Sequence, residues 1–180
     1  MESLRGKLLV ASPALEDPNF ARGVVLITQH TEEGAMGIVL NRPSETISTD
    51  SIDELEGLGG GEPLYVGGPV QPNAVVVLCE FSDPSASAWI VVADVGFLAA
   101  DADKGAAAEH VRRARVYAGY SGWASGQLEA ELEREDWIVE PPIPRELFPA
   151  DPGRLWSDVL ERKGGQFALI SRMPADPSLN

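Results

Sequence analysis

Three glycines within eight residues, Gly119, Gly122 and Gly126, constrain the fold of this chain more than any other feature of its sequence. Glycine lets the backbone bend where a side chain would clash. Segment 119–131 therefore predicts the end of a strand, a glycine-rich turn and the start of an acidic helix, with Ser125 as the helix cap. A turn of this kind points free backbone N–H groups outward, which is a common way to build a binding site. The candidates in this segment for contact with a ligand are Ser121, Trp123, Gln127 and Glu131, although packing in the core is the favoured role of Trp123.

Short apolar runs rich in β-branched residues, separated by glycine and proline, fill most of the remaining chain. They predict strands at residues 7–11, 24–30, 35–40, 64–66, 73–80, 89–92, 95–98, 112–118, 136–139 and 166–171. The run at 24–30 is typical of a strand buried on both faces. The short loop that follows it predicts a hairpin with 35–40.

Helices are expected at 49–55, at 101–110, at 125–135 and after Asp151, which precedes a proline suited to the first helical turn. Strict alternation of strands and helices is absent, which disfavours a doubly wound sheet. Glycines inside strand-like segments favour a curved sheet. The sequence therefore predicts an α+β fold: a curved, barrel-like, mostly antiparallel sheet flanked by three or four helices. Without an internal repeat or a linker, residues 1–180 are expected to form a single domain.

Charge and cysteine content limit the possible partners and the compartment. Lys and Arg total 14 against 28 Asp and Glu, which gives a net charge of −14. Such a chain repels nucleic acid and anionic membranes unless a local patch overrides the net charge. The one cysteine, Cys79, cannot form an internal disulfide and suits a reducing cytoplasm. No apolar run approaches the roughly 18 to 20 residues of a membrane span. We therefore expect a cytoplasmic protein without membrane contact.

The sequence contains few patterns typical of catalytic or metal-binding sites. The segment around Ser121 resembles a serine elbow, but its second glycine comes one residue early, so a hydroxyl that bonds the backbone is favoured over a nucleophile. His30, His110 and Cys79 lack the paired spacing of metal ligands. His30 could act as a ligand or a base, although ordering a turn through hydrogen bonds is the favoured role. We expect no metal and no cofactor.

One basic cluster stands out in the acidic chain: Lys104, Arg112, Arg113 and Arg115. These residues could contact phosphates and so provide a direct DNA-binding surface. The alternative is a solvated strand face, whose arginines pair with the glutamates of the predicted helix at 129–135.

Several motifs occur together in an order that resembles the AlgH-like (YqgE) family of bacterial proteins. They are residues 6–13, His30, residues 34–43, residues 67–70 and residues 119–131. The resemblance implies a cytosolic, compact α+β domain with a curved, barrel-like sheet. It implies no catalytic residues, and some members carry a transcription-regulator label. Two departures lie in the glycine-rich segment: Ser121 stands where alanine is common, and Ser125 precedes Gly126.

Three functions follow from these observations. The first is a non-enzymatic regulatory or protein-interaction module with an unknown protein partner. The second is an enzyme whose small anionic ligand is held among His30, Asn41, Arg42 and Gln127, with Arg42 gripping the anion and Asn41 orienting it. The third is a direct DNA-binding regulator that uses the strand at 112–115. The candidate ligand-binding residues are His30, Asn41, Arg42, Ser121, Trp123, Gln127 and Glu131.

Overall fold

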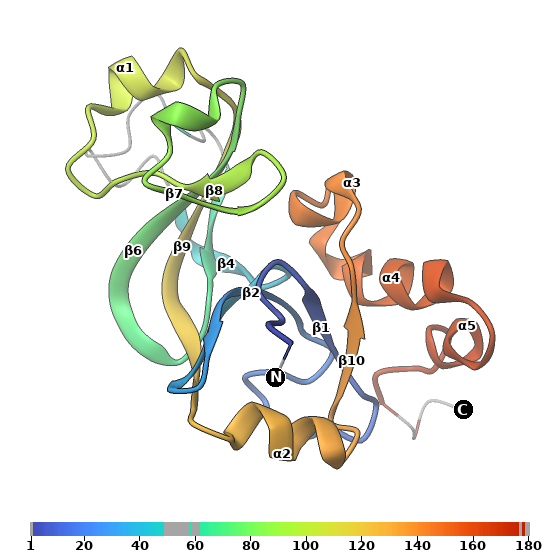
Figure 1. Ribbon diagram of the computed structural model, residues 1–180. Coiled ribbons are helices and arrows are strands. Elements are labelled where there is room, and N and C mark those ends of the chain that lie inside the picture. The colour runs from blue at the N-terminus through green and yellow to red at the C-terminus, as the bar shows by residue number, and fades with distance from the viewer. Residues whose placement is uncertain (1, 49–57, 59–61, 177, 179–180) are drawn as a thin grey trace.

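The computed structural model describes residues 2–48, 58, 62–176 and 178, and its centre is one open, curved β-sheet. The strand order along the sheet is β10-β1-β2-β3-β9-β6-β8-β7, and β4 and β5 form a branch that joins at β9 (Figure 1). Every pairing is antiparallel except that of β5 with β9 within the described ranges. The predicted α+β class is confirmed, with a curved sheet that does not close.

The first part of the sheet is built from β1 (Leu8–Ala11), β2 (Val24–Thr31), β3 (Gly34–Val39) and β10 (Trp137–Glu140). All four lie where the sequence predicts strands. The predicted hairpin of β2 and β3 is confirmed by their antiparallel register. The first five residues of β2 are buried, as expected for a strand that is covered on both faces.

The second part contains β4 (Pro43–Ser48), β5 (Pro63–Val66), β6 (Val70–Phe81), β7 (Trp89–Val92), β8 (Val95–Phe97) and β9 (Val111–Ala124). The two long strands, β6 and β9, bend strongly along their length (Figure 1). Strand β9 connects the two parts, because one end pairs with β3 and the rest pairs with β6.

Five α-helices flank the sheet in the described part of the chain, one more than the upper expectation. They are α1 (Lys104–Ala108), α2 (Gln127–Glu133), α3 (Pro144–Leu147), α4 (Leu155–Lys163) and α5 (Gln166–Ile170). Asp151 accepts a hydrogen bond from the Gly153 N–H and caps a short 3₁₀ turn, Pro152–Arg154, that leads into α4. None of the described helices is long and apolar enough to cross a bilayer. The helix predicted at 49–55 lies outside the described residues.

The prediction of a last strand at 166–171 is wrong, because this segment forms α5. Phe167 and Ile170, three residues apart, both pack against the core, whereas Leu169 is 70% exposed. That spacing belongs to a helix rather than a strand. The apolar run was too short for its period to be distinguished from the sequence alone.

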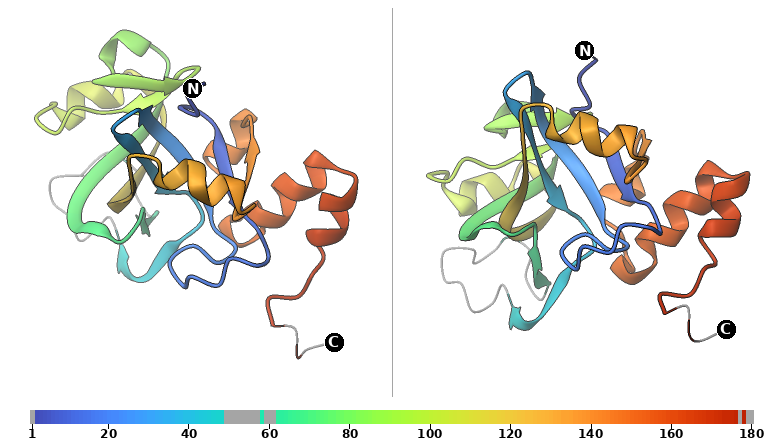
Figure 2. Two further views of the ribbon diagram at one scale, coloured as in Figure 1. Left: turned by 60° about the horizontal axis from the view of Figure 1, so that its bottom comes forward. Right: turned by 90° about the horizontal axis from the view of Figure 1, so that it is seen from below.

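Helices α2 and α4 lie on different sides of the first part of the sheet (Figure 2), and apolar side chains pack on both of its faces. On one face, Leu8 and Val10 meet Trp156 and Leu160 of α4. On the other face, Leu9 and the neighbouring strands meet Leu128 of α2 together with Trp123 and Trp137. A third cluster lies in the second part of the sheet and includes Val77, Cys79, Phe81, Val116 and Ala107 of α1. Because successive side chains of a strand point to opposite faces, one sheet contributes to a layer of core on each of its two sides.

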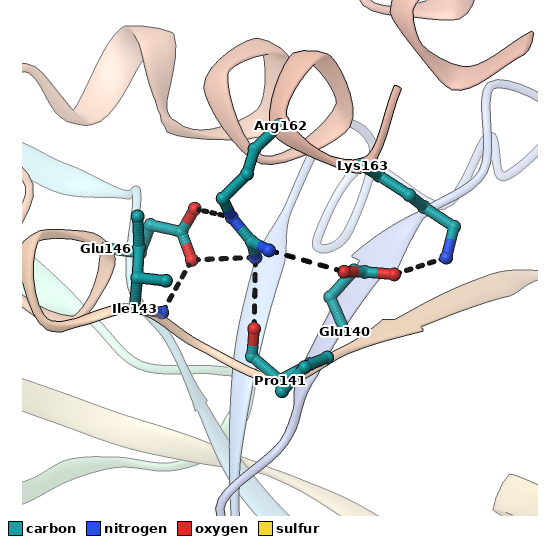
Figure 3. A network of polar contacts seen from close by, with 6 residues as sticks. All are labelled: Glu140, Pro141, Ile143, Glu146, Arg162 and Lys163. Atoms are coloured by element: carbon teal, nitrogen blue, oxygen red, sulfur yellow. Dashed lines mark hydrogen bonds and ion pairs between the residues drawn. The ribbon is translucent and has the colours of Figure 1, made fainter. Parts of the chain in front are cut away.

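A buried ion network ties β10 to α3 and α4 (Figure 3). The guanidinium of Arg162 donates to both carboxylate oxygens of Glu146, at 2.6 and 3.0 Å, and to the carbonyl of Pro141 at 3.0 Å. Glu140 pairs with Arg162 and with Lys163. Glu146 is only 2% exposed and also accepts the N–H of Ile143. The bonds from Glu146 raise the pKa of Arg162 above its usual value.

Replacing Glu146 by alanine should lower the free energy of unfolding by about 3 kcal/mol, because it leaves a partly buried guanidinium without its main partner. The matched control is Asp158→Ala, which removes an exposed pair with Arg154 in the same region and should cost less than about 1 kcal/mol. Urea unfolding of the two variants measures both values. Equal losses would contradict a structural role for the network.

Candidate functional site

The glycine-rich segment is not a turn at its first two glycines, and this corrects the expectation. Strand β9 continues through Gly119 and Gly122 to Ala124, and the turn falls at Ser125 and Gly126. Gly119 has φ +71 within the strand, a conformation that glycine adopts without strain. The first glycines therefore shape a strand rather than a ligand-binding loop.

These glycines permit two backbones to approach closely. The N–H of Gly67 donates to Ala118 at 2.8 Å, and the carbonyl of Gly67 accepts the N–H of Val39 at 2.9 Å. A Cβ atom at Gly67 would lie 2.3 Å from the carbonyl oxygen of Gly119, and one at Gly119 would lie 2.4 Å from the carbonyl oxygen of Gly68. We call this contact of Gly67 and Gly68 with Gly119 the glycine crossing. It explains the glycines of both motifs by packing.

Ser121 belongs to the same crossing. Its side chain is fully buried, and its hydroxyl donates to the carbonyl of Gly67 at 3.2 Å. A hydroxyl that bonds the backbone was the favoured interpretation from the sequence, and the geometry agrees with it. In this conformation an external ligand does not reach the Ser121 oxygen.

Helix α2 is held by a carboxylate that accepts three donors. The indole N–H groups of Trp123 and Trp137 both donate to Oε2 of Glu131, each at 2.8 Å. The amide of Gln127 donates to Oε1 of Glu131 at 3.0 Å, while its oxygen accepts the N–H of Ala124 at 3.0 Å. We call these four side chains, Trp123, Gln127, Glu131 and Trp137, the α2 corner. The pairing of Gln127 with Glu131 follows from their spacing of four residues, whereas Trp137 had no signal in the sequence.

The N-terminus of α2 differs from the expectation. Gly126, with φ +75, is the N-cap, and no side chain caps the helix there. The predicted cap, Ser125, instead donates its hydroxyl to the carbonyl of Glu32 at 2.6 Å. Ser125 thus fastens the turn to the β2–β3 hairpin instead of capping the helix.

His30 joins three segments of the chain. Its Nδ1 accepts the N–H of Leu4 at 3.0 Å, so in the neutral ring the proton resides on Nε2, which donates to Glu129 at 2.8 Å. The carbonyl of His30 accepts the hydroxyl of Ser3 at 3.2 Å. The hydrogen bond from the backbone N–H of Glu129 and the bond from His30 lower the pKa of the Glu129 carboxyl. His30 orders the N-terminal segment against β2 and α2.

Asn41 and Arg42 lie far from the α2 corner. Asn41 is buried and accepts the N–H of Val24 at 3.0 Å, and its amide donates to Arg22 at 2.9 Å. Val24 and His30 are six residues apart on β2, which places them about 20 Å apart along the strand. The guanidinium of Arg42 donates to the carbonyl of Ala21, and burial lowers its pKa. The two residues fix the loop before β2.

The candidate residues open onto different surface hollows. One of about 160 Å³ lies beside Trp123, one of about 460 Å³ is lined by His30, Arg5 and Trp89, and one of about 340 Å³ is lined by Arg42. The structure therefore brings together Trp123, Gln127 and Glu131, with His30 bonded to the same helix. It does not bring Asn41 or Arg42 to them, and the hydroxyl of Ser121 bonds Gly67 instead.

The arginines of the basic cluster have acidic partners close by. Arg112 contacts Asp94 at 2.7 Å, and Arg113 contacts Glu80 at 2.6 Å. Arg115 is buried, donates to the carbonyl of Pro149 at 2.7 Å and pairs with Glu62. Lys104 donates to the carbonyl of Ala100 at 3.0 Å. The expected pairing with the glutamates at 129–135 is wrong, because neighbouring strands and loops supply the carboxylates.

Groups that could bind metal or act as nucleophiles are sparse. Within the described ranges, no three His, Cys, Asp or Glu side chains gather in a way that could hold a metal ion. Cys79 is fully buried, and burial raises its pKa to about 12. This thiol is a core side chain rather than a reactive one.

Comparison with known proteins agrees with this fold. The AlgH-like family model matches residues 8–168. A UPF0301 protein of Streptomyces coelicolor is 40% identical over 188 residues, which covers 100% of this chain and 97% of that one. The crystal structure of protein DIP2367 from Corynebacterium diphtheriae matches with a TM-score of 0.85 and 29% identity, covering 96% of this chain and 94% of that one.

The solution structure of the AlgH protein from Pseudomonas aeruginosa matches with a TM-score of 0.71 and 29% identity over 97% of this chain and 98% of that one. Together these matches identify the class as an α+β domain of the UPF0301 type. This chain belongs to the AlgH-like family, as the order of its motifs indicated.

Replacing Gly119 by alanine should lower the free energy of unfolding by more than about 3 kcal/mol, because the methyl group meets a backbone oxygen and the positive φ adds strain. Gly126→Ala is the matched control: its φ is also positive, but nothing lies within 4 Å of the new atom, so the loss should be about 1 kcal/mol. Thermal unfolding compares the two. A small loss at Gly119 would show that the crossing is not tight.

Replacing Glu129 by glutamine should destabilise the protein in a pH-dependent way. A carboxyl whose pKa is lowered in the folded state contributes stability above its ordinary value of 4.5 and loses it as the pH falls through the lowered pKa. The difference in stability between the wild type and the variant should be largest above pH 4.5 and should shrink below it. Denaturant titrations at several pH values measure this difference. Glu133→Gln, in the same helix, is the control, and an equal pH dependence there would refute the role of the His30 bond.

Proposed function

We propose that this protein is a non-enzymatic regulatory or protein-interaction module. The observation that carries the proposal is that the polar side chains expected to bind a ligand are engaged within the fold. His30, Asn41, Ser121, Gln127 and Glu131 each hydrogen-bond another segment or the same helix corner. Polar groups that are hydrogen-bonded in this way hold structural elements in place, and few of their donors and acceptors remain free to bind a substrate.

The first alternative, an enzyme for a small anionic ligand, has less support. Its proposed ligand site needs His30, Asn41, Arg42 and Gln127 around one cavity. His30 and Arg42 line separate hollows, and the hydrogen bonds of Asn41 and Arg42 join them to the loop before β2. Catalysis requires such groups to converge within a few ångströms of a reacting atom.

Direct DNA binding also has less support. Arg112 and Arg113 already contact carboxylates, and the chain carries a net charge of −14. Binding DNA would require these arginines to exchange their carboxylate partners for phosphates against that net repulsion. A regulatory role through a protein partner agrees better with an acidic surface. The single buried thiol suits a reducing compartment, and we place the module in the cytoplasm.

The immobilised protein should retain a specific protein from a lysate of Streptomyces coelicolor, which carries a similar UPF0301 protein, and the binding should weaken as salt is raised if charge contributes. The control is an unrelated acidic domain of similar size and net charge on the same resin. Retention of no partner at any salt concentration would contradict the proposal. In parallel, a thermal-shift screen with phosphate and small carboxylates should leave the melting temperature unchanged, and a clear rise would favour the enzyme instead.

A further inference from the structure

Strand β10 forms one end of the sheet and pairs only with β1 in the part of the chain that the structure describes (Figure 1). The N–H of Ser12 donates to the carbonyl of Asp136 at 2.9 Å, and this bond shows which opposite residues of β1 and β10 form the hydrogen-bonded pairs. Hydrogen-bonded pairs alternate along an antiparallel ladder. Ile138 and Glu140 therefore bond β1, and the backbone groups of Trp137 and Val139 point outward.

A groove of about 640 Å³ runs beside this edge. One wall is β10 itself, from Trp137 to Val139. The other wall is made by apolar side chains of α5 and the residues after it, Phe167, Ile170 and Met173. Met173 is 49% exposed, and Phe167 and Ile170 are partly buried against the core. An unpaired strand edge thus lies beside an apolar wall that is partly open to solvent in the described part of the chain.

Three charged residues line the groove: Arg134, Glu135 and Lys163. Arg134 pairs with Asp136 at 2.8 Å, and Lys163 pairs with Glu140. Glu135, which also lines the groove, is exposed and lacks a cationic partner among the described residues. Once the carboxylate partners Asp136 and Glu140 are counted, Glu135 carries the one uncompensated charge among these lining residues, and the whole chain is also acidic.

We propose that this groove binds an extended, basic and apolar segment of a partner protein, which adds a strand to β10. The outward N–H and C=O groups of Trp137 and Val139 require a partner with unpaired backbone groups, and an extended segment has them, whereas a helix bonds its own. Apolar side chains on one face of the segment pack against Phe167 and Ile170, and a lysine or arginine faces Glu135. This inference rests on the proposed function, since it names the partner of the interaction module.

A second copy of this chain fits the groove less well than a basic segment does. Two copies would each carry a charge of −14, and the edge is only four residues long. The repulsion between the copies opposes pairing of their β10 strands. Self-association is therefore treated as a contrary outcome of the test.

In the test, heptapeptides that bind the immobilised full chain are selected from a random displayed library. Their affinity for the wild type is then compared with their affinity for the variant Val139→Pro. Proline removes the outward N–H of residue 139 and is tolerated at a strand edge, so the fold should persist. Val139→Thr keeps the N–H and is the matched control. We expect selected peptides, measured by fluorescence anisotropy, to be enriched in apolar and basic residues. They should bind Val139→Pro at least about tenfold more weakly than the wild type and Val139→Thr.

A second measurement leaves the protein unchanged and removes hydrogen bonds from the peptide instead. Methylating alternate backbone amides of a selected peptide in one register should abolish binding, whereas methylation in the other register should preserve it, because only every second amide faces β10. In hydrogen exchange, the bound peptide should protect the amides of Trp137 and Val139. This arm holds even if Val139→Pro fails to fold.

The outcomes separate this inference from the proposed function. No enrichment of peptides, equal binding to Val139→Pro, or insensitivity to methylation in both registers would overturn strand addition. If the wild type dimerises and Val139→Pro does not, the partner of the groove is a second copy of the chain and the proposed peptide segment is wrong. If the Val139→Pro variant still binds the partner found in the lysate, the protein remains an interaction module, but the partner binds another surface than this groove.

Discussion

The close contact of two backbones at the glycine crossing is the constraint on which the rest of the sheet depends. Along the chain, strand β9 pairs first with β6 and then with β3, and it changes partner where Gly67 and Gly68 pass Gly119. Any side chain at these positions would lie within 2.4 Å of backbone atoms of the other segment. The two parts of the sheet therefore share one strand because three residues have no Cβ.

The α2 corner transmits that arrangement to the helical layer. Because β9 ends at Ala124, directly before the turn into α2, the position of Trp123 is set by the strand and that of Glu131 by the helix. One carboxylate that accepts two indole N–H groups holds the two elements together. Phe20 stacks on Trp123, and the two indole rings meet edge-on. His30 adds a second attachment through Glu129. The residues that first suggested a binding site are thus the ones that join sheet and helix.

The two ends of the sheet differ in a way that bears on function. At β7, the guanidinium of Arg5 donates to the carbonyl of Ile90, so a side chain of the N-terminal segment covers part of that edge. At β10, the outer backbone groups face an apolar groove instead. Native proteins usually blunt a free edge by shortness, charge or a covering segment. Strand β10 is short, and the groove beside it leaves room for a segment of a partner protein to cover its edge.

The sequence by itself determined the class of the fold, most strands and the packing of Trp123 in the core, because β-branched runs and alternation are local consequences of side-chain shape. It also indicated the capped start of the helical segment after Asp151. The tertiary structure alone decided that 119–124 is a strand, that 166–170 is a helix, and that Arg112 and Arg113 contact Asp94 and Glu80. These outcomes depend on which backbone or carboxylate lies opposite in space, and residues distant in the chain supply that information. From the sequence, a glycine that is needed for a turn cannot be distinguished from one that allows a second backbone to approach. Only the segment that lies opposite the glycine in the folded protein distinguishes the two roles.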